Sequence, residues 1–176
     1  MIKFFKERIA RYLLKKNAKK VWHDRQSFSG WFKKSFSFLV IMPEEEDDFK
    51  YAIQVLNFLK DEKKKIIIFT HDYRISLLPA SLRSCAIEHG IDDLNKLDFP
   101  SRRIIEKLNQ HEFQSIIDLN RKENIFYLAV IVSLDCPVKI GFSKNQVDRF
   151  YNLQVKIDEE SAELSYRNLL NCLKMF

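Results

Sequence analysis

The chain has 176 residues, of which 46% are hydrophobic and 31% are charged, a balance that suits one folded domain and excludes a disordered protein. Its three glycines, Gly30, Gly90 and Gly141, stand far apart, so the phosphate-binding loops GxGxxG and GxxxxGK[ST] are absent and no cofactor is expected. The three cysteines form no CxxC pair, and no apolar run approaches the roughly 20 residues of a membrane span. We therefore expect a cytoplasmic protein with reduced thiols and no transmembrane segment.

The positive charge is concentrated at the N-terminus. Residues 1–34 hold eleven basic residues against Glu7 and Asp24, a net charge of +9, so the remaining 142 residues carry −3 of the total of +6. Such asymmetry favours an anionic partner for this segment, which we call the arm. The residues expected to bind that partner are Lys3, Lys6, Arg8, Arg11, Lys15, Lys16, Lys19, Lys20, Arg25, Lys33 and Lys34.

The pattern of the arm predicts a basic amphipathic helix, because no Pro or Gly interrupts residues 1–26. The apolar residues that would share one face are Ile2, Phe5, Ile9 and Leu13. The aromatic residues that follow, interleaved with lysines, are Trp22, Phe28, Trp31 and Phe32. Such a mixture suits RNA, where rings stack on unpaired bases, and also a bilayer surface. A third interpretation is that the apolar face packs on the domain and the lysines are only solvated.

The rest of the chain, residues 35–176, predicts a single Rossmann-like α/β domain. Short apolar runs that read as strands alternate with helical patterns, which favours a mostly parallel sheet of about four to five strands flanked by helices. The expected strands are 37–42, 66–69, 113–119 and 138–142. The expected helices are 44–61, 101–109, 125–134 and a last one capped by Asp158, with a short helix and loops over 73–98.

Few residues of the domain are candidates for chemistry. His71, Asp72 and Asp118 stand at the carboxyl ends of predicted strands, where parallel sheets bind ligands. Neighbours on one chain point apart as a rule, which weakens a His71–Asp72 pair. The acidic run 44–48 is typical of a helix start, and we expect no metal site. Gly141 indicates a close approach within its strand.

Two stretches carry a resemblance to a known family. Residues 113–119 read FQSIIDL and residues 139–142 read KIGF. They resemble the F-D-x-x-I-D-L and R/K-I-G-F strands in the N-terminal Rossmann-like half of heptosyltransferase-type glycosyltransferases, which implies a half domain that binds a nucleotide or sugar. That family places a Gly-Asp turn with a catalytic Asp after its first strand, where this chain has Met42-Pro43-Glu44.

By its layout the chain also resembles a family of small Bacteroidota proteins known only as a domain of unknown function. Those proteins open with a Lys-rich helix and continue with strand, helix and strand to a K-V/I-G-I/F strand. The resemblance implies a bacterial cytoplasmic protein and supplies no activity.

We therefore expect a non-catalytic binding or adaptor protein whose arm docks on an anionic surface, either ribosomal RNA or the inner face of the membrane, where the protein would be peripheral. One alternative is a glycosyltransferase-like half domain that uses His71, Asp72 and Asp118. Another is a homo-oligomeric structural module in which the helical arm packs against a second copy.

Overall fold

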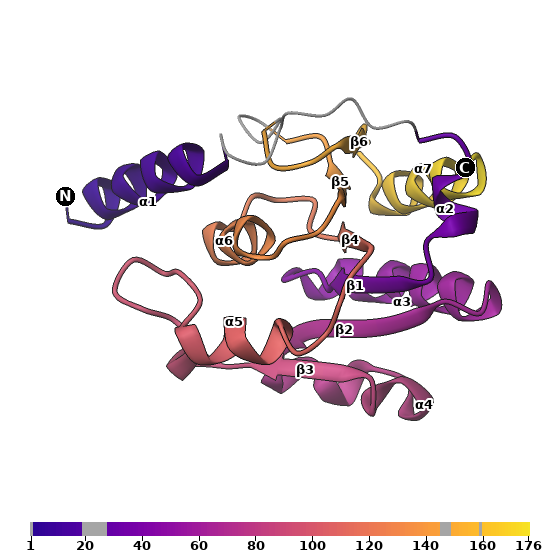
Figure 1. Ribbon diagram of the computed structural model, residues 1–176, viewed down its shortest axis with the longest axis horizontal. Helices are drawn as coiled ribbons and strands as arrows, with labels where there is room; N and C mark the ends of the chain where they lie inside the picture. Colours follow the sequence, from indigo (N-terminus) through magenta and orange to yellow (C-terminus); the bar gives the residue numbers. More distant parts are fainter. Residues whose placement is uncertain (1, 19–27, 145–148, 159) are drawn as a thin grey trace.

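The fold is described by a computed structural model, which covers residues 2–18, 28–144, 149–158 and 160–176 (Figure 1). At its centre lies a parallel sheet with the strand order β3-β2-β1-β4-β5-β6. The strands are β1 (Ser37–Ile41), β2 (Lys65–His71), β3 (Ala86–His89), β4 (Ser115–Asp118), β5 (Val138–Phe142) and β6 (Leu153–Val155). This is the order of the Rossmann fold, and its direction reverses between β1 and β4.

The predicted α/β class with a parallel sheet and flanking helices is confirmed, but the predicted number of four to five strands is wrong, because the described sheet has six. The two strands that the sequence did not indicate, β3 and β6, are the short edge strands. β3 reads AIEH and β6 reads LQV, and each has too few consecutive apolar residues to stand out from a loop.

Helices cover both faces of the sheet. The α-helices are α1 (Ile2–Ala18), α2 (Trp31–Lys34), α3 (Glu46–Asp61), α4 (Ala80–Arg83), α5 (Arg102–Leu108), α6 (Ile125–Ser133) and α7 (Ala162–Lys174). Two short 3₁₀ helices, η1 (Asp72–Leu77) and η2 (Ile91–Asp93), follow β2 and β3. The last helix is capped by Ser161, whose side chain accepts a hydrogen bond from the backbone of Leu164, and not by Asp158 as predicted. Within the described residues, no helix is both long and apolar enough to cross a membrane.

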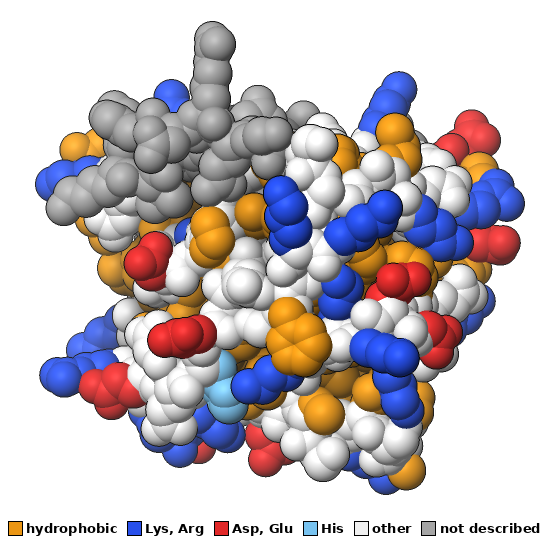
Figure 2. Space-filling view, turned by 45° about the vertical axis from the view of Figure 1, so that its right-hand side comes forward, with side chains coloured by type: hydrophobic (Ala, Val, Ile, Leu, Met, Phe, Trp, Pro, Cys, Tyr) orange, Lys and Arg blue, Asp and Glu red, His pale blue; other side chains and the backbone are white. Residues whose placement is uncertain are grey.

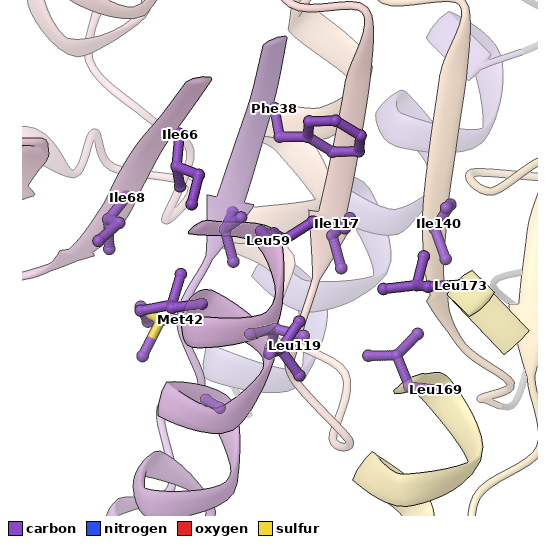
Figure 3. Close-up of a cluster of buried hydrophobic side chains, with 14 of the residues drawn as sticks. Phe38, Met42, Leu59, Ile66, Ile68, Ile117, Leu119, Ile140, Leu169 and Leu173 are labelled. Carbon is purple, nitrogen blue, oxygen red and sulfur yellow. The ribbon is translucent and has the colours of Figure 1, made fainter. Parts of the chain in front are cut away.

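Alternate residues of each strand point to opposite faces of the sheet, which divides the core into two layers. On one face, Phe38 and Met42 of the β1 segment, with Ile68 and Ile117, pack against α3 and α7 (Figure 3). On the other face, Leu39 and Ile41, with residues of β2, β3 and β4, pack against α5 and α6. Both layers are filled by hydrophobic side chains.

The helix α1 lies on the second face, beside α6 (Figure 1). Its buried positions are Ala10, Leu14 and Ala18, four residues apart, whereas Ile9 is 37% exposed. Of the predicted face, Ile9 and Leu13 are therefore each one residue away from the buried positions Ala10 and Leu14, and the side chains of Ile2 and Phe5 lie outside the described ones. The predicted helix over residues 1–26 is described as far as Ala18, and residues 19–27, with Trp22, lie outside the described residues.

The aromatic residues at the end of the arm belong to the core of the domain. Trp31 and Phe32 are buried and contact Phe38 of β1, with ring centroids 6.1 and 5.8 Å from its ring. The indole Nε1 of Trp31 donates a hydrogen bond to the Ser115 hydroxyl at 3.1 Å. These two rings are therefore not available to stack on bases or to lie in a membrane surface.

The predicted close approach at Gly141 is confirmed, and it leads to a stability prediction. A Cβ atom on Gly141 would lie 2.6 Å from Cε1 of the buried Tyr151 ring, which cannot move aside because its hydroxyl is hydrogen bonded. We expect Gly141→Ala to lower the free energy of unfolding by about 1–3 kcal/mol, measured by urea denaturation.

Gly90→Ala is the matched control. Its Cβ would lie 2.8 Å from Oδ2 of Asp72, which is the end of an exposed side chain that can rotate away. Equal losses of stability in the two variants would contradict the packing described for Gly141.

Candidate functional site

The carboxyl edge of the sheet carries polar side chains after each of its first five strands. They are Glu44 after β1, His71 at the end of β2, His89 at the end of β3, Asp118 at the end of β4 and Lys144 after β5. Open parallel sheets bind ligands at this edge, at the point where the strand order reverses. In this protein that point lies between β1 and β4.

Asp118 is buried in a network that uses both of its carboxylate oxygens. Its Oδ1 accepts hydrogen bonds from the backbone N and the Nδ2 of Asn120, at 3.0 and 2.7 Å. Its Oδ2 accepts from Lys144 Nζ at 2.8 Å and from the Tyr151 hydroxyl at 2.5 Å. The side chains of Asp118 and Lys144 are 2% and 4% exposed, so they form a buried ion pair. Asp118 thus ties β4 to the segment after β5, and it has little capacity left for a substrate.

Asn120 links the segments that follow β1 and β4. Its Nδ2 also donates to the Met42 carbonyl at 3.1 Å, and its Oδ1 accepts from the backbone N of Glu44 at 2.8 Å. Next to it, Arg121 forms a two-pronged ion pair with the buried Asp48 at the start of α3, with both distances 2.8 Å. The Met42 carbonyl and the backbone N atoms of Glu44 and Asn120 at the reversal point are therefore occupied by the protein itself.

The second cluster lies at the ends of β2 and β3. The register pairs His71 with His89, and their ring centroids are 4.9 Å apart. His71 Nδ1 lies 2.6 Å from Oδ1 of Asp72, so these neighbours do not point apart as expected. The reason is that η1 begins at Asp72, where the alternation of the strand ends. The structure brings His71 and Asp72 together and places Asp118 in a different network.

His89 is buried between two rings, with centroids 4.7 Å from Phe69 and 4.6 Å from Phe126. Its Nε2 lies 3.1 Å from the Tyr127 hydroxyl, and its Nδ1 has no hydrogen-bond partner among the described residues. Burial, and secondly the charge of His71, lower the pKa of His89 from 6.5 to about 4. Burial also raises the pKa of Tyr127. The imidazole is therefore neutral at pH 7.

Two adjoining cavities open beside this cluster. The inner cavity has a volume of about 120 Å³, and its lining residues are Glu44, His71, Tyr73, Arg74, His89, Leu94, Asn124, Phe126 and Tyr127. The outer cavity has about 470 Å³ and reaches Glu7 and Arg11 of α1. Both are lined by Glu44, Leu94, Asn124 and Phe126, so they meet at these side chains. In the described part of the chain, no three His, Cys, Asp or Glu side chains are grouped so that they could hold a metal ion.

The basic residues of the arm differ in their ion pairs and in their exposure to solvent. Lys6 pairs with Asp98 at 2.8 Å, and Arg11 pairs with Glu7 at 2.8 Å and Glu123 at 2.5 Å, so these two are engaged within the chain. The exposed ones are Arg8, Lys16, Lys33 and Lys34, and Lys15 is half-buried. The side chain of Lys3 and the residues Lys19, Lys20 and Arg25 lie outside the description.

Two residues of the inner cavity, Arg74 and His89, were not among the candidates that the sequence suggested. Both lie in residues 73–98, which contain a short helix, α4, as predicted, and also the edge strand β3, which was not predicted. The available signal was the apolar pair Ala86-Ile87 before Glu88, which is too short to identify a strand.

Comparisons with known proteins leave the family open. No family model matches the chain, and no curated protein matches it. Among solved structures, the chain is similar to an exopolyphosphatase-related protein from Bacteroides fragilis, with a TM-score of 0.49 and 16% identity. The match covers 82% of this chain and 42% of that one, so this chain spans less than half of that protein's length. At this similarity, nothing about activity is transferred.

The Asp118 network leads to a prediction about stability. Asp118→Ala leaves the buried Lys144 ammonium without its carboxylate, and we expect a loss of about 3–5 kcal/mol in the free energy of unfolding. Urea denaturation of the single and double variants measures the effect. The double variant Asp118→Ala, Lys144→Met removes the isolated charge and should recover at least about 1 kcal/mol. Strictly additive losses would show that the two side chains are not paired.

The burial of His89 predicts a pH-dependent stability. Since the pKa of His89 is lower in the folded state, the unfolded chain binds the proton first as the pH falls. The stabilisation by the neutral ring is complete above pH 6.5 and is lost on acidification toward pH 4, by about 3 kcal/mol for the full shift.

His89→Gln removes this titration, and the measurement is the urea midpoint between pH 7 and 4. We expect a shallower pH dependence in this variant than in the parent chain. His111→Gln, at a half-buried position outside the cluster, serves as the control and should keep the parent slope. An unchanged slope in His89→Gln would contradict the assignment.

Proposed function

We propose that this protein is a non-catalytic binding or adaptor protein that docks on an anionic partner through the outward face of α1. One observation carries the proposal: Ala10, Leu14 and Ala18 fix α1 on α6, and this leaves Arg8, Tyr12 and Lys16 exposed. Positions 8, 12 and 16 are four residues apart, so they form one stripe along the helix. We call these three residues the outer stripe.

The packing of α1 favours RNA over a bilayer as the partner. A helix that binds a bilayer surface buries its apolar face among the lipids. In α1, Leu14 and Ala18 are already packed in the core of the domain, and Trp31 and Phe32 are in the core as well. The outer stripe presents two cations and one aromatic ring, which suit phosphate contacts and stacking on an unpaired base.

The distribution of charge elsewhere on the molecule agrees with a role for the arm. On the face that Figure 2 displays, Lys and Arg side chains are interspersed with Asp and Glu and do not gather into one basic patch. The whole of residues 35–176 carries −3, so that part of the chain does not attract phosphate by its net charge. The arm supplies more than the entire positive excess.

The two alternatives have less support. The Rossmann strand order suits a nucleotide-binding half of a glycosyltransferase, but Asp118 and Asn120 occupy the reversal point with internal hydrogen bonds. In a homo-oligomer the outer stripe would contact a second copy instead of RNA. Light scattering of the full chain separates that case, since a monomer excludes it.

A charge reversal of the outer stripe tests the proposal. We expect Arg8→Glu with Lys16→Glu to lower the affinity for a single-stranded oligouridylate at least about tenfold, because two phosphate contacts are lost. The slope of log K against log salt should become less steep by about two. The measurement is fluorescence anisotropy over a range of salt concentrations, with co-sedimentation on ribosomes as the second assay.

The matched control reverses two exposed cations on α7, Arg167→Glu with Lys174→Glu. This changes the net charge equally on the opposite face of the sheet and should leave binding within about twofold of the parent once net charge is screened by salt. Equal losses in both variants would mean that binding depends on net charge alone and would contradict docking through α1. Binding to anionic vesicles and not to RNA would replace RNA by a membrane surface.

A further inference from the structure

Arg74 is a buried cation without an anion. It lies in η1, two residues after Asp72 of the His71–Asp72 pair, and the residue is only 7% exposed. Its Nε and Nη1 have no hydrogen-bond partner among the described residues, and no ion pair of the described chain includes it. A buried charge is costly unless it is paired, so a cation held in this way calls for a counter-charge from outside the protein.

Other arginines of the same domain are not left in this state. Arg121 forms two hydrogen bonds with the carboxylate of Asp48. Arg83 donates to the carbonyl oxygens of Leu78 and Ser76, both at 2.9 Å. Arg74 lies against the Tyr73 ring, with its guanidinium carbon 5.2 Å from the ring centroid, but this contact supplies no carboxylate. Its Nε and Nη1 therefore differ from the paired nitrogens of Arg121 and Arg83.

The surroundings of Arg74 form a site of the size of one small charged group. It lines the inner cavity of about 120 Å³ together with Tyr127 and Asn124 and with the rings of His71, Tyr73 and His89. The walls are mainly aromatic. At Leu94 and Phe126 the cavity meets the outer one of about 470 Å³, which gives room for the remainder of a ligand.

We propose that the inner cavity binds the carboxylate group of a small organic acid, with Arg74 as the residue that binds it and with the rest of the acid directed past Leu94 and Phe126 into the outer cavity. A guanidinium group and a carboxylate match in shape and in charge. This inference is independent of the docking of α1 on RNA, since it uses none of the outer stripe.

The charge around the cavity favours a single negative charge over a double one. His89 is neutral, so Arg74 is the cation that the cavity offers. Glu44 lines the same cavity, and Asp72 lies next to His71. A phosphate dianion would bring two negative charges close to these carboxylates, whereas a carboxylate brings one, which Arg74 can pair with directly.

Thermal unfolding of the full chain with defined probes tests the proposal. The probes are acetate, benzoate, inorganic phosphate and benzamide, which is the uncharged counterpart of benzoate. We expect benzoate at ten times its Kd to raise the Tm by about 3–6 °C and benzamide at the same concentration to leave it unchanged. An NMR titration that follows the Arg74 Nε–H signal with benzoate gives the direct readout.

Variants at Arg74 separate binding from folding. Arg74→Met removes an unpaired buried charge, so it should fold with an unchanged or higher Tm and should lose the benzoate shift. Arg74→Lys keeps the charge without the planar donors and should bind at least about tenfold more weakly. Arg83→Met is the control and should keep the response to benzoate. The Arg8→Glu, Lys16→Glu chain should keep it as well, which separates this site from the docking of α1.

Three results would overturn the proposal. One is the absence of any Tm or NMR response to acetate and benzoate in the parent chain. Another is an equal response to benzamide, or a larger response to phosphate than to benzoate. The third is an Arg74→Met variant that folds and still responds to benzoate as the parent does.

Discussion

The ion pair between Asp118 and Lys144 holds the end of β4 to the segment after β5, and the arrangement of the carboxyl edge follows from it. Both charges are buried, and the remaining oxygen positions of Asp118 are filled by Asn120 and Tyr151. Such a pair is stable in a low-dielectric interior only when its hydrogen bonds are satisfied, which commits all four side chains to structure. In a Rossmann-type sheet this is the place where a ligand ordinarily binds. Here the protein fills it with its own polar groups.

The polar groups that remain unsatisfied lie two strands away, at the ends of β2 and β3. There the register sets His71 opposite His89, and η1 carries Arg74 into the same region. Among the described residues, Nδ1 of His89 and Nε and Nη1 of Arg74 have no hydrogen-bond partner, whereas both carboxylate oxygens of Asp118 are hydrogen bonded. The same sheet edge therefore has a closed half and a half that is prepared for a ligand. The helix α1 contributes Glu7 and Arg11 to the outer cavity and presents its other side to solvent.

The sequence was sufficient for the parts of the fold that rest on long apolar runs. The central strands and α6 follow from such runs, and α3 and α7 follow from apolar residues at helical spacing, because each buries at least one face. It was not sufficient for β3 and β6, which gain their strand conformation from the neighbouring strand and carry few apolar residues of their own. Since β3 positions His89 and ends near Arg74, the inner cavity could not be predicted without predicting β3. Likewise, the aromatic residues at the end of the arm were predicted to contact RNA or a bilayer. Only their packing on Phe38 shows that Trp31 and Phe32 belong to the core.

Both proposed ligands bind away from the reversal point of the sheet. Chemical-shift mapping of the isotope-labelled full chain, titrated separately with benzoate and with oligouridylate, tests this most directly. Benzoate should shift signals of His71, Arg74, His89 and Tyr127, and oligouridylate should shift those of the outer stripe on α1. Asp118, Asn120 and Lys144 should be unaffected in both titrations. Shifts centred on Asp118 and Asn120 with either ligand would contradict the account and would return the function to the reversal point between β1 and β4.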